Sequence, residues 1–456
     1  MIAGGFALYL LVIAAIAVVA WRRTRDIADY LLGGRRTSPW VAALSAGASD
    51  MSGWLLLGLP GLAVIAPASA AWTAAGLLVG TWLNWRLVAQ PLREASASLG
   101  ALTLPDFLAR RFPRQAGPLR VLTALTIVVF FLLYTSAGLV AGGKLFNTVF
   151  GLAYGEAVVL GALLILAYTL CGGFLAVTWT DAFQALLMSA ALLLVSGLLV
   201  AAPPPAAPTA TVTSAPGPAA VVSALAWGLG YFGQPHILAR FMALAAPARA
   251  ARARHIAVSW TGLGLVTAVV IGSAGAGLVG AGDDPERVFM LAVADRFPPW
   301  LAGFCLAAIL AAVMSTADSQ LLVTAAALAE DLLPRAGQGS AARRLRNGRI
   351  AVAVVAVAAC ALALDPESGV FALVARAWAG FGATLGPVLL IALYARRASG
   401  RGAVAGLLGG AVVVSAWPLL PGDGFGVYEL LPGFVAALAL NLGVNRLQAR
   451  AEDGPA

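Results

Sequence analysis

Apolar residues along this chain are gathered in long runs that short stretches rich in arginine, proline or glycine separate. The runs are about 20 residues long, the length that a helix needs to cross the hydrocarbon of a bilayer. The pattern predicts an all-α integral membrane protein with about thirteen transmembrane helices. The predicted spans lie near residues 3–21, 39–64, 70–92, 119–143, 155–177, 182–201, 219–239, 256–280, 300–329, 350–364, 370–394, 402–420 and 426–445.

Two of these spans carry small and polar residues where the others are apolar. The second reads SAGASDMSGW from Ser45 to Trp54, and the seventh reads WGLGYFGQPH from Trp227 to His236. Glycine, proline and polar side chains at membrane depth predict an interrupted helix. Unpaired backbone groups in hydrocarbon cost several kcal/mol each, so a break persists only where it lines a protein cavity or binds something. We expect the two breaks to form the functional centre.

The two broken spans lie five spans apart, and because five is odd their helices run in opposite directions through the membrane. This is the signature of an inverted-topology repeat, with spans 2–6 and spans 7–11 as the two halves. The chain then forms one transmembrane domain over 1–456: a first span and cytoplasmic loop at 1–38, repeat one at 39–201, an outer loop at 202–218, repeat two at 219–394, and peripheral spans with a short cytoplasmic tail at 395–456.

Composition agrees with a membrane protein, because 61% of residues are apolar and only 11% are charged. The net charge of +9 is explained by topology rather than by nucleic acid, since 24 of the 29 basic residues fall in alternate loops on one side of the predicted spans. By the positive-inside rule that side is cytoplasmic, which places the N-terminus outside and the C-terminus inside.

The basic residues of the cytoplasmic side come from Arg22–Arg36, Arg93–Arg120, Arg240–Arg254, Arg335–Arg349 and the stretch from Arg396 to Arg450. All basic residues but one are arginines, which is typical of a GC-rich bacterial genome. We therefore expect a multi-pass protein of the bacterial inner (plasma) membrane.

Asp50 is the residue most indicative of function, because a carboxylate near the middle of a span is costly and usually pairs or contacts an ion. A structural role stays open, in which Asp50 accepts backbone N–H bonds from its broken helix. A remote alternative is an intramembrane enzyme in which Asp50 and Asp318 share a proton as a carboxylate pair.

Adjacent hydroxyls occur at Ser315 and Thr316 within the otherwise apolar ninth span. Either hydroxyl could simply bond the carbonyl one turn earlier in its own helix. Together with carbonyls freed at Ala48 and Met51, however, they would supply hard oxygens suited to a small cation such as sodium. Near the breaks, aromatic side chains could either pack or contact a solute: Trp54, Tyr134, Trp227 and Tyr231.

The two histidines, His236 and His255, lie far apart in sequence and are expected on the cytoplasmic side. They support neither a zinc site nor a histidine-based triad. No glycine-rich loop with a phosphate-binding lysine occurs either. We expect no cofactor beyond a coupling ion, no enzymatic activity and no nucleic-acid partner.

Three segments resemble the sodium/solute symporter family: GASDMSGW at Gly47–Trp54, WGLGYFGQPHILARF at Trp227–Phe241 and AAVMST at Ala311–Thr316. The first two are similar to its proline-transporting branch. Further similar stretches are LGGR at 32–35, ALTLPD at 101–106, GGFLAV at 172–177 with WTD at 179–181, and AWAGFG at 377–382. The resemblance covers nearly the whole chain.

The resemblance implies a LeuT-like core with sodium as the coupling ion. Carried over by position, the sodium site would comprise backbone oxygens of Ala48, Met51 and Ala312, hydroxyls of Ser315 and Thr316, and the carboxylate of Asp50. Asp181 would lie near the cytoplasmic ion exit, where it would contribute to release or gating. The substrate region would comprise Ser52, Gly53, Tyr134, Trp227, Tyr231 and Pro235.

The function expected from these residues is sodium-coupled symport of L-proline into the cell by alternating access. Another small amino acid or a monocarboxylate stays open as the solute, as does coupling to protons through Asp50. A passive channel is a further class that uphill accumulation would exclude. The expected partners are proline or a similar small solute, sodium and the lipid bilayer.

Overall fold

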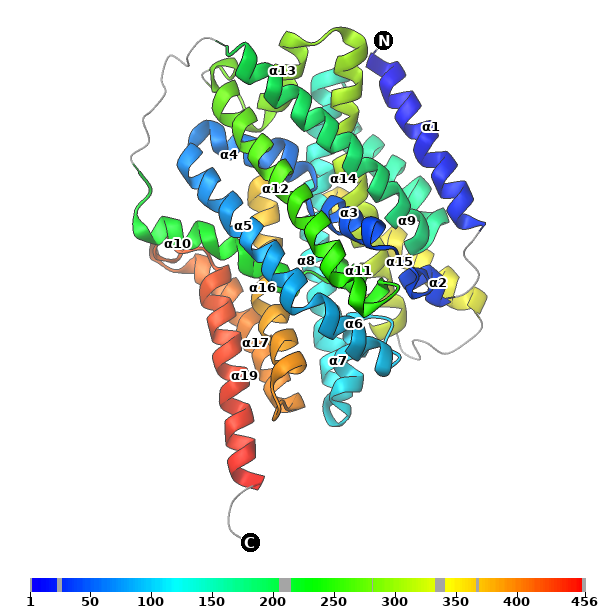
Figure 1. Cartoon of the computed structure of the whole chain (residues 1–456), viewed down its shortest axis with the longest axis vertical. Helices are drawn as coiled ribbons and strands as arrows, with labels where there is room; N and C mark the ends of the chain where they lie inside the picture. The colour runs from blue at the N-terminus through cyan, green and yellow to red at the C-terminus, as the bar shows by residue number, and fades with distance from the viewer. Residues whose placement is uncertain are drawn as a thin grey trace.

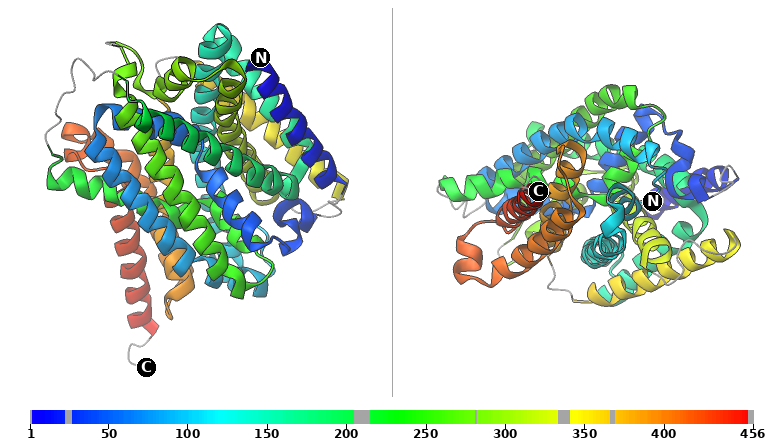
Figure 2. Two further views of the ribbon diagram at one scale, coloured as in Figure 1. Left: turned by 45° about the horizontal axis from the view of Figure 1, so that its top comes forward. Right: turned by 90° about the horizontal axis from the view of Figure 1, so that it is seen from below.

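The computed structural model describes residues 2–22, 27–204, 215–280, 282–332, 341–365 and 369–452. Over these residues the protein is a bundle of helices, and the β-structure consists of one isolated bridge between Thr37 and Leu244. The first helix begins at one end of the molecule and the last helix ends at the opposite end (Figure 1). Two further views show the helices packed closely around a common centre (Figure 2).

Eight helices of the described residues are long and apolar enough to cross a membrane, or nine if one bent pair counts as a single span. They include α1 (Ile2–Trp21), α8 (Ala116–Phe150), the second part of α9 (Tyr154–Ala201), α12 (Ala250–Gly275), α14 (Pro299–Ala326), α16 (Val370–Tyr394), α17 (Gly400–Ala416) and α19 (Leu430–Glu452). The other predicted spans coincide with α5 (Pro67–Leu87), the first part of α9, α10–α11 and α15 (Ala341–Leu362). The all-helical membrane fold is confirmed, whereas the number thirteen stays a prediction.

The boundary between the fifth and sixth predicted spans is wrong. We expected a connection between residues 177 and 182, but α9 is helical there and departs from helical geometry at Gly173, whose φ is 63°. Glycine adopts this left-handed conformation without a steric penalty. Polar residues of this segment have partners inside the protein: the Thr180 hydroxyl donates to its own helix, and Asp181 binds an arginine.

The first predicted break is confirmed between α3 (Pro39–Asp50) and the π-turn Trp54–Gly58 that leads into α4 (Leu59–Ile65). The Ser38 hydroxyl caps the start of α3 by accepting from the Val41 N–H. The two halves of the span are bent by 61°.

The second predicted break is confirmed as well. The helix α10 (Pro218–Ala226) tightens into a 3-10 turn at Trp227–Gly233, passes through an extended Gln234 and resumes as α11 (Pro235–Ala243). Glycine is required within the turn, because a β-carbon on Gly230 would collide with the indole ring of Trp378.

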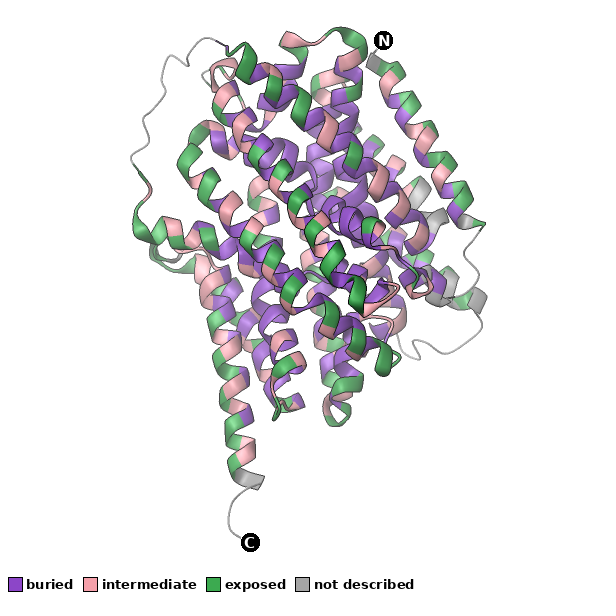
Figure 3. Cartoon of the chain, viewed as in Figure 1, coloured by how far each residue is buried: buried purple, intermediate pink, exposed green. Residues whose placement is uncertain are grey.

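The breaks lie against the most buried helices of the bundle. In α14 and α16, 83% of the apolar window is buried inside the protein, compared with 28% for α1 and 33% for both α17 and α19. Buried residues accordingly concentrate in the middle of the bundle, and exposed ones lie on the outer faces and ends (Figure 3). The functional residues discussed below come from this buried centre.

Candidate functional site

Asp50 lies where the two breaks meet. Its side-chain Oδ2 accepts a hydrogen bond of 2.7 Å from the Tyr231 hydroxyl, which belongs to the second break. Its backbone carbonyl accepts from the Tyr134 hydroxyl and from the Trp54 indole N–H, both at 2.9 Å. Asp50 is only 1% exposed. One residue therefore ties together the two broken helices and α8.

The Asp50 carboxylate has few hydrogen bonds. Tyr231 is its one hydrogen-bond partner among the described residues, and Oδ1 is buried with none. No backbone N–H of the broken helix among these residues binds the carboxylate, so the bonds expected of the structural alternative are not seen, and the role of Asp50 stays a prediction. Asp50 also makes no hydrogen bond to Asp318, which accepts from the Ser319 hydroxyl at 3.2 Å. The buried free oxygen remains available to a ligand.

Four of the residues predicted to bind a cation lie together. The Ser315 hydroxyl donates to the carbonyl of Ala48 at 2.9 Å and to that of Ala312 at 3.2 Å. The Thr316 hydroxyl lies 3.4 Å from the Ala48 carbonyl. In a continuous helix the Ser52 N–H would donate to the Ala48 carbonyl. Here it donates to the backbone carbonyl of Asp50 instead, so the Ala48 carbonyl is accessible.

These contacts differ from those of an ordinary hydroxyl in a helix. Ser315 does bond its own helix, as the conservative interpretation expects, but both hydroxyls also reach across to the end of α3. Met51 is the residue at which α3 ends, with φ −83° and ψ 72°. No hydrogen bond joins it to α14 within the described part of the chain, so its predicted role stays a prediction.

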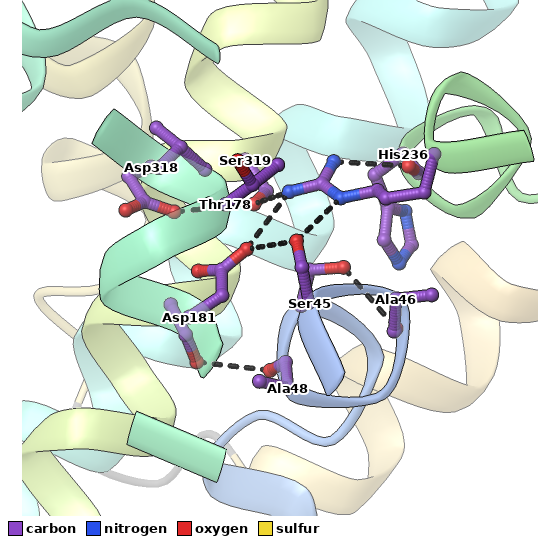
Figure 4. Close-up of polar contacts among 12 residues, drawn as sticks. Ser45, Ala46, Ala48, Thr178, Asp181, His236, Asp318 and Ser319 are labelled. Carbon is purple, nitrogen blue, oxygen red and sulfur yellow. Dashed lines mark hydrogen bonds and ion pairs between the residues drawn. The ribbon is translucent and has the colours of Figure 1, made fainter. Parts of the chain in front are cut away.

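A buried ion pair lies next to these oxygens. Asp181 Oδ2 is 3.0 Å from Arg240 Nη2 and accepts a hydrogen bond of 2.6 Å from the Ser45 hydroxyl. The Arg240 guanidinium also donates to Ser45 at 3.0 Å and to Ser319 at 2.5 Å. Figure 4 shows Asp181, Ser45 and Ser319 converging on one point. The side chains of Asp181 and Arg240 are 0% and 1% exposed, respectively.

Arg240 is a functional candidate that the sequence analysis missed. It was assigned to a cytoplasmic loop, but α11 stays helical to Ala243 and carries Arg240 into the protein. No signal in the sequence identified it, because its partner Asp181 lies 59 residues away and their burial depends on the fold.

An aromatic cluster covers the second break. Trp227 is stacked between Phe371, at 4.9 Å between ring centroids, and Tyr428, at 5.1 Å. The Trp378 indole donates to the Trp227 carbonyl at 2.8 Å and packs edge-on against the Tyr231 ring. Sequence analysis gave Trp378 no role, although it lies in the AWAGFG segment that supports the family resemblance.

The remaining predicted substrate residues lie at two places. Ser52 and Gly53 form the break itself, and a β-carbon on Gly53 would lie 2.5 Å from that of Ala141 on α8. Pro235 instead lines a separate small cavity of about 40 Å³ that also includes Phe174. The structure therefore does not bring Pro235 together with the aromatic cluster.

His236 lies inside the protein, and the side of the membrane on which it was expected stays a prediction. It is fully buried on α11, 5.6 Å from the Phe131 ring and 6.3 Å from the Tyr134 ring. Neither imidazole nitrogen has a hydrogen-bond partner within the described residues. His255 lies on the exposed surface of α12. No group of three His, Cys, Asp or Glu residues that could hold a metal ion occurs in the described part of the chain.

A second buried charge cluster lies near the other end of the broken helices. Lys144 Nζ is 2.7 Å from Asp284 Oδ2 and 2.6 Å from Glu286 Oε2. Glu286 also accepts from the Phe371 N–H at 2.9 Å. Since Phe371 stacks on Trp227, this cluster holds the start of α16 against the second break.

Comparisons with known proteins agree with this architecture. The sequence profile described as "SSF: Sodium:solute symporter family" matches residues 30–410. The sodium/proline symporter of Escherichia coli (strain K12) is 43% identical over 452 residues, which cover 94% of this chain and 90% of that protein. The osmoregulated proline transporter OpuE of Bacillus subtilis (strain 168) is 42% identical, with coverage of 97% and 94%.

Solved structures show the same fold. A sodium-coupled sialic acid symporter, solved in a substrate-bound outward-open state, superimposes with a TM-score of 0.81 at 18% identity and covers 98% of this chain and 97% of its own. Mhp1, a transporter of the nucleobase-cation-symport-1 family, superimposes with a TM-score of 0.60 at 16% identity, with coverage of 94% and 96%.

Proposed function

The chain belongs to the sodium:solute symporter family, and from that premise we propose that it imports L-proline into the cell together with sodium. Relatives named sodium/proline symporters, 40–43% identical over most of the chain, support proline as the solute. One structural observation carries the proposal: the Ser315 hydroxyl reaches the Ala48 carbonyl across the first break. The protein is a multi-pass membrane transporter and not an enzyme.

Sodium would bind among the oxygens of Ala48, Ala312, Ser315 and Thr316, with Met51 as a further candidate. These are hard oxygens, as a small cation prefers, and they come from the broken helix of one repeat and a continuous helix of the other. The free Oδ1 of Asp50 lies in the same broken segment and offers negative charge. Binding would thus hold α3 against α14, which links the ion to the conformation of the core.

Proline at neutral pH is a zwitterion with an apolar ring, so its site needs donors for a carboxylate, acceptors for an ammonium and an apolar wall. The N–H groups around Ser52 and Gly53, where the helix restarts, suit the carboxylate. The rings of Tyr134 and Tyr231 would form the wall, because their hydroxyls are already bound to Asp50. Trp227 stacks on two rings, so it would meet the solute by the part of its indole that they leave free or once a stack opens.

Alternating access would use the two buried charge clusters as gates. The Asp181–Arg240 pair connects Ser45 of repeat one with Ser319 of repeat two. Ser45 lies three residues from Ala48, and Ser319 lies three residues from Thr316, so the pair is within one turn of the cation oxygens on both helices. Sodium release toward the cytoplasm would accompany the opening of this pair. The Lys144 cluster would close the opposite, outer side.

The finer topology belongs to the same proposal: about thirteen crossings, an N-terminus outside, a C-terminus inside, repeats in spans 2–6 and 7–11, and a bacterial inner membrane. The position of the two ends of the described chain at opposite ends of the molecule supports an odd number of crossings. The breaks in the second and seventh predicted spans support the inverted repeats.

A second candidate is proton coupling, which the unpartnered Oδ1 of Asp50 favours because a lone buried carboxylate oxygen can carry a proton. Binding of labelled proline to the purified protein distinguishes the two ions. Sodium coupling predicts that sodium at fixed pH raises proline affinity, while acidification with choline replacing sodium does not. Proline affinity that depends on pH and ignores sodium would favour the proton. No binding of proline under either condition would point to another small amino acid or a monocarboxylate.

A further inference from the structure

An open cavity of about 870 Å³ lies at the end of the molecule where the last helix finishes. Three segments far apart in sequence line it: residues 111–115 before α8, residues 396–401 from the end of α16 into the first turn of α17, and residues 445–449 of α19. Its lining contains no carboxylate. It includes five arginines: Arg111, Arg114, Arg396, Arg397 and Arg401. The cavity therefore concentrates positive charge without an acidic residue in its wall.

Three other arginines of the predicted cytoplasmic side have carboxylate partners. Arg36 pairs with Asp29 at 2.6 Å, and both Arg110 and Arg120 pair with Asp106 at 2.8 Å. By contrast, Arg114, Arg396 and Arg401 form no salt bridge with any described residue. The positive-inside rule explains why arginines lie on this side, but it does not explain why unpaired ones gather around one cavity.

Neutral donors and a helix start complete the lining. The cavity reaches the N-terminus of α17, a helix of 17 residues whose first turn carries Arg401 and is capped by Ser399. The start of a helix has a partial positive charge that favours anions. The side chains of Gln115 and Gln448 add amide groups to the same wall. Both the guanidinium group of arginine and the N-terminus of a helix bind phosphate oxygens well.

We propose that this cavity binds the phosphate-bearing headgroup of an anionic phospholipid. Basic pockets between helices on the cytoplasmic side of membrane proteins suit such headgroups. The cavity would hold the headgroup between the start of α8 and the peripheral helices α17 and α19. The occupant would thereby stabilise the contact between the peripheral helices and the rest of the bundle.

The surface next to the cavity favours a lipid over free phosphate. On α17, Leu408 and Val412 follow Arg401 by 7 and 11 residues, so they share its helix face, and they are 47% and 65% exposed. On α8, Val121 and Leu125 are 44% and 46% exposed above residues 111–115. Apolar surface for acyl chains thus begins at the rim of the phosphate site.

The test is lipid binding by the purified full chain in a neutral detergent, measured by titration with cardiolipin. The site variant combines Arg114→Gln, Arg396→Gln and Arg401→Gln, all at exposed positions that leave the Arg111 contact with the Ala392 carbonyl intact. The control variant combines Arg249→Gln and Arg252→Gln, which remove exposed arginines at the start of α12, away from the cavity. Arg396→Gln alone is the reserve if the triple variant does not fold.

Cardiolipin affinity should fall about a hundredfold in the site variant, because each basic residue near an anionic headgroup contributes roughly a fivefold factor. The control variant should bind like the parent, and Arg396→Gln alone should lose about fivefold. Affinity for cardiolipin should also fall as salt increases. Orientation in the membrane has no influence in detergent, so failure of the proposed topology or of proline transport is separate from failure here.

Equal cardiolipin affinity in the parent and the site variant would overturn the assignment of the site. A second outcome is that inorganic phosphate displaces cardiolipin when both supply the same concentration of phosphate groups. That result would contradict a phospholipid as the occupant and indicate a soluble phosphate. Equal binding of phosphatidylcholine would show that the cavity does not select negative charge, which also contradicts the proposal.

Discussion

At the scale of single residues, the structure distinguishes hydroxyls that could bind an ion from hydroxyls that only bond their own helix. Ser315 and Thr316 reach the Ala48 carbonyl, whereas Thr324 on the same helix donates only to the Gln320 carbonyl. Ser315→Ala and Thr316→Ala should therefore each raise the sodium concentration for half-maximal proline uptake about tenfold, since a lost ligand costs on the order of 1.4 kcal/mol.

The control for this prediction is Thr324→Ala, which is buried on α14 as well. It should leave the sodium dependence unchanged, because its hydroxyl satisfies only a carbonyl of its own helix. Sodium dependence identical in all three variants would return Ser315 and Thr316 to the role of ordinary helix hydroxyls.

Trp227 should affect the solute without affecting the ion. Its ring is part of the aromatic cluster over the second break and does not contact the oxygens of Ala48 or Ser315. Trp227→Ala should weaken proline binding about tenfold or more, measured with labelled proline, while sodium still stabilises the purified protein against heat. Trp417→Ala, outside the cluster, is the matched control. Unchanged proline binding in Trp227→Ala would place the solute elsewhere.

The residues that sequence analysis identified are polar or charged residues that are costly to place at membrane depth. Asp50, Ser315 and Thr316 are unusual at membrane depth whatever their neighbours, so the chain alone predicts their importance. The burial of Arg240 and His236 depends on where α11 enters the bundle, which the sequence does not state. A partner that lies far away in the chain cannot be read from a local pattern.

At the scale of elements, both helix breaks were predictable because glycine or proline occurs there together with polar residues at membrane depth, whereas Pro387 alone leaves α16 continuous. The end of the fifth span was not. The polar residues near Asp181 are satisfied by hydrogen bonds inside the protein, and the departure from the helix occurs at Gly173. Polarity marks a helix end only where no other element supplies a partner.

The packing of the second break on α5 gives a prediction for this scale. A β-carbon on Gly80 would collide with the backbone of Gly228, next to Trp227. Gly80→Ala should therefore destabilise the protein by about 1–3 kcal/mol and impair proline binding. Gly197→Ala in α9, where nothing lies within 4 Å of the added atom, should be neutral or slightly stabilising. Thermal unfolding in detergent compares the two, and equal melting temperatures would contradict the close contact.

At the scale of the whole molecule, the number of crossings is the least predictable feature. All predicted spans coincide with helices, yet only eight or nine helices of the described residues are both long and apolar enough to cross a membrane. Tyr154–Ala167 and Pro218–Gly233 are apolar but shorter than 18 residues, the latter because it ends at the second break. In contrast, α14 carries Ser315 and Thr316 and still qualifies, so polar site residues do not by themselves hide a span.

The Asp181–Arg240 pair tests how the two repeats are joined. Asp181→Asn or Arg240→Gln alone leaves one buried charge unpaired, which should cost about 3–5 kcal/mol of stability and slow uptake. The double variant should recover much of the stability but lose gating, measured as sodium-independent efflux of proline. Arg110→Gln, which breaks a partly exposed pair with Asp106, should cost less than about 1 kcal/mol. Additive losses in the double variant would show that the pair is not coupled.

The most direct test of the central claim is uphill uptake of labelled proline into proteoliposomes under an imposed sodium gradient and an inside-negative potential. One sodium ion per proline gains about 2.3 kcal/mol from 100 mV and about 1.4 kcal/mol from a tenfold sodium gradient, enough for accumulation of several hundredfold. We expect accumulation that requires sodium and stops when both driving forces are dissipated. Proline uptake that proceeds without sodium under a pH gradient, or no accumulation of proline at all, would contradict the account.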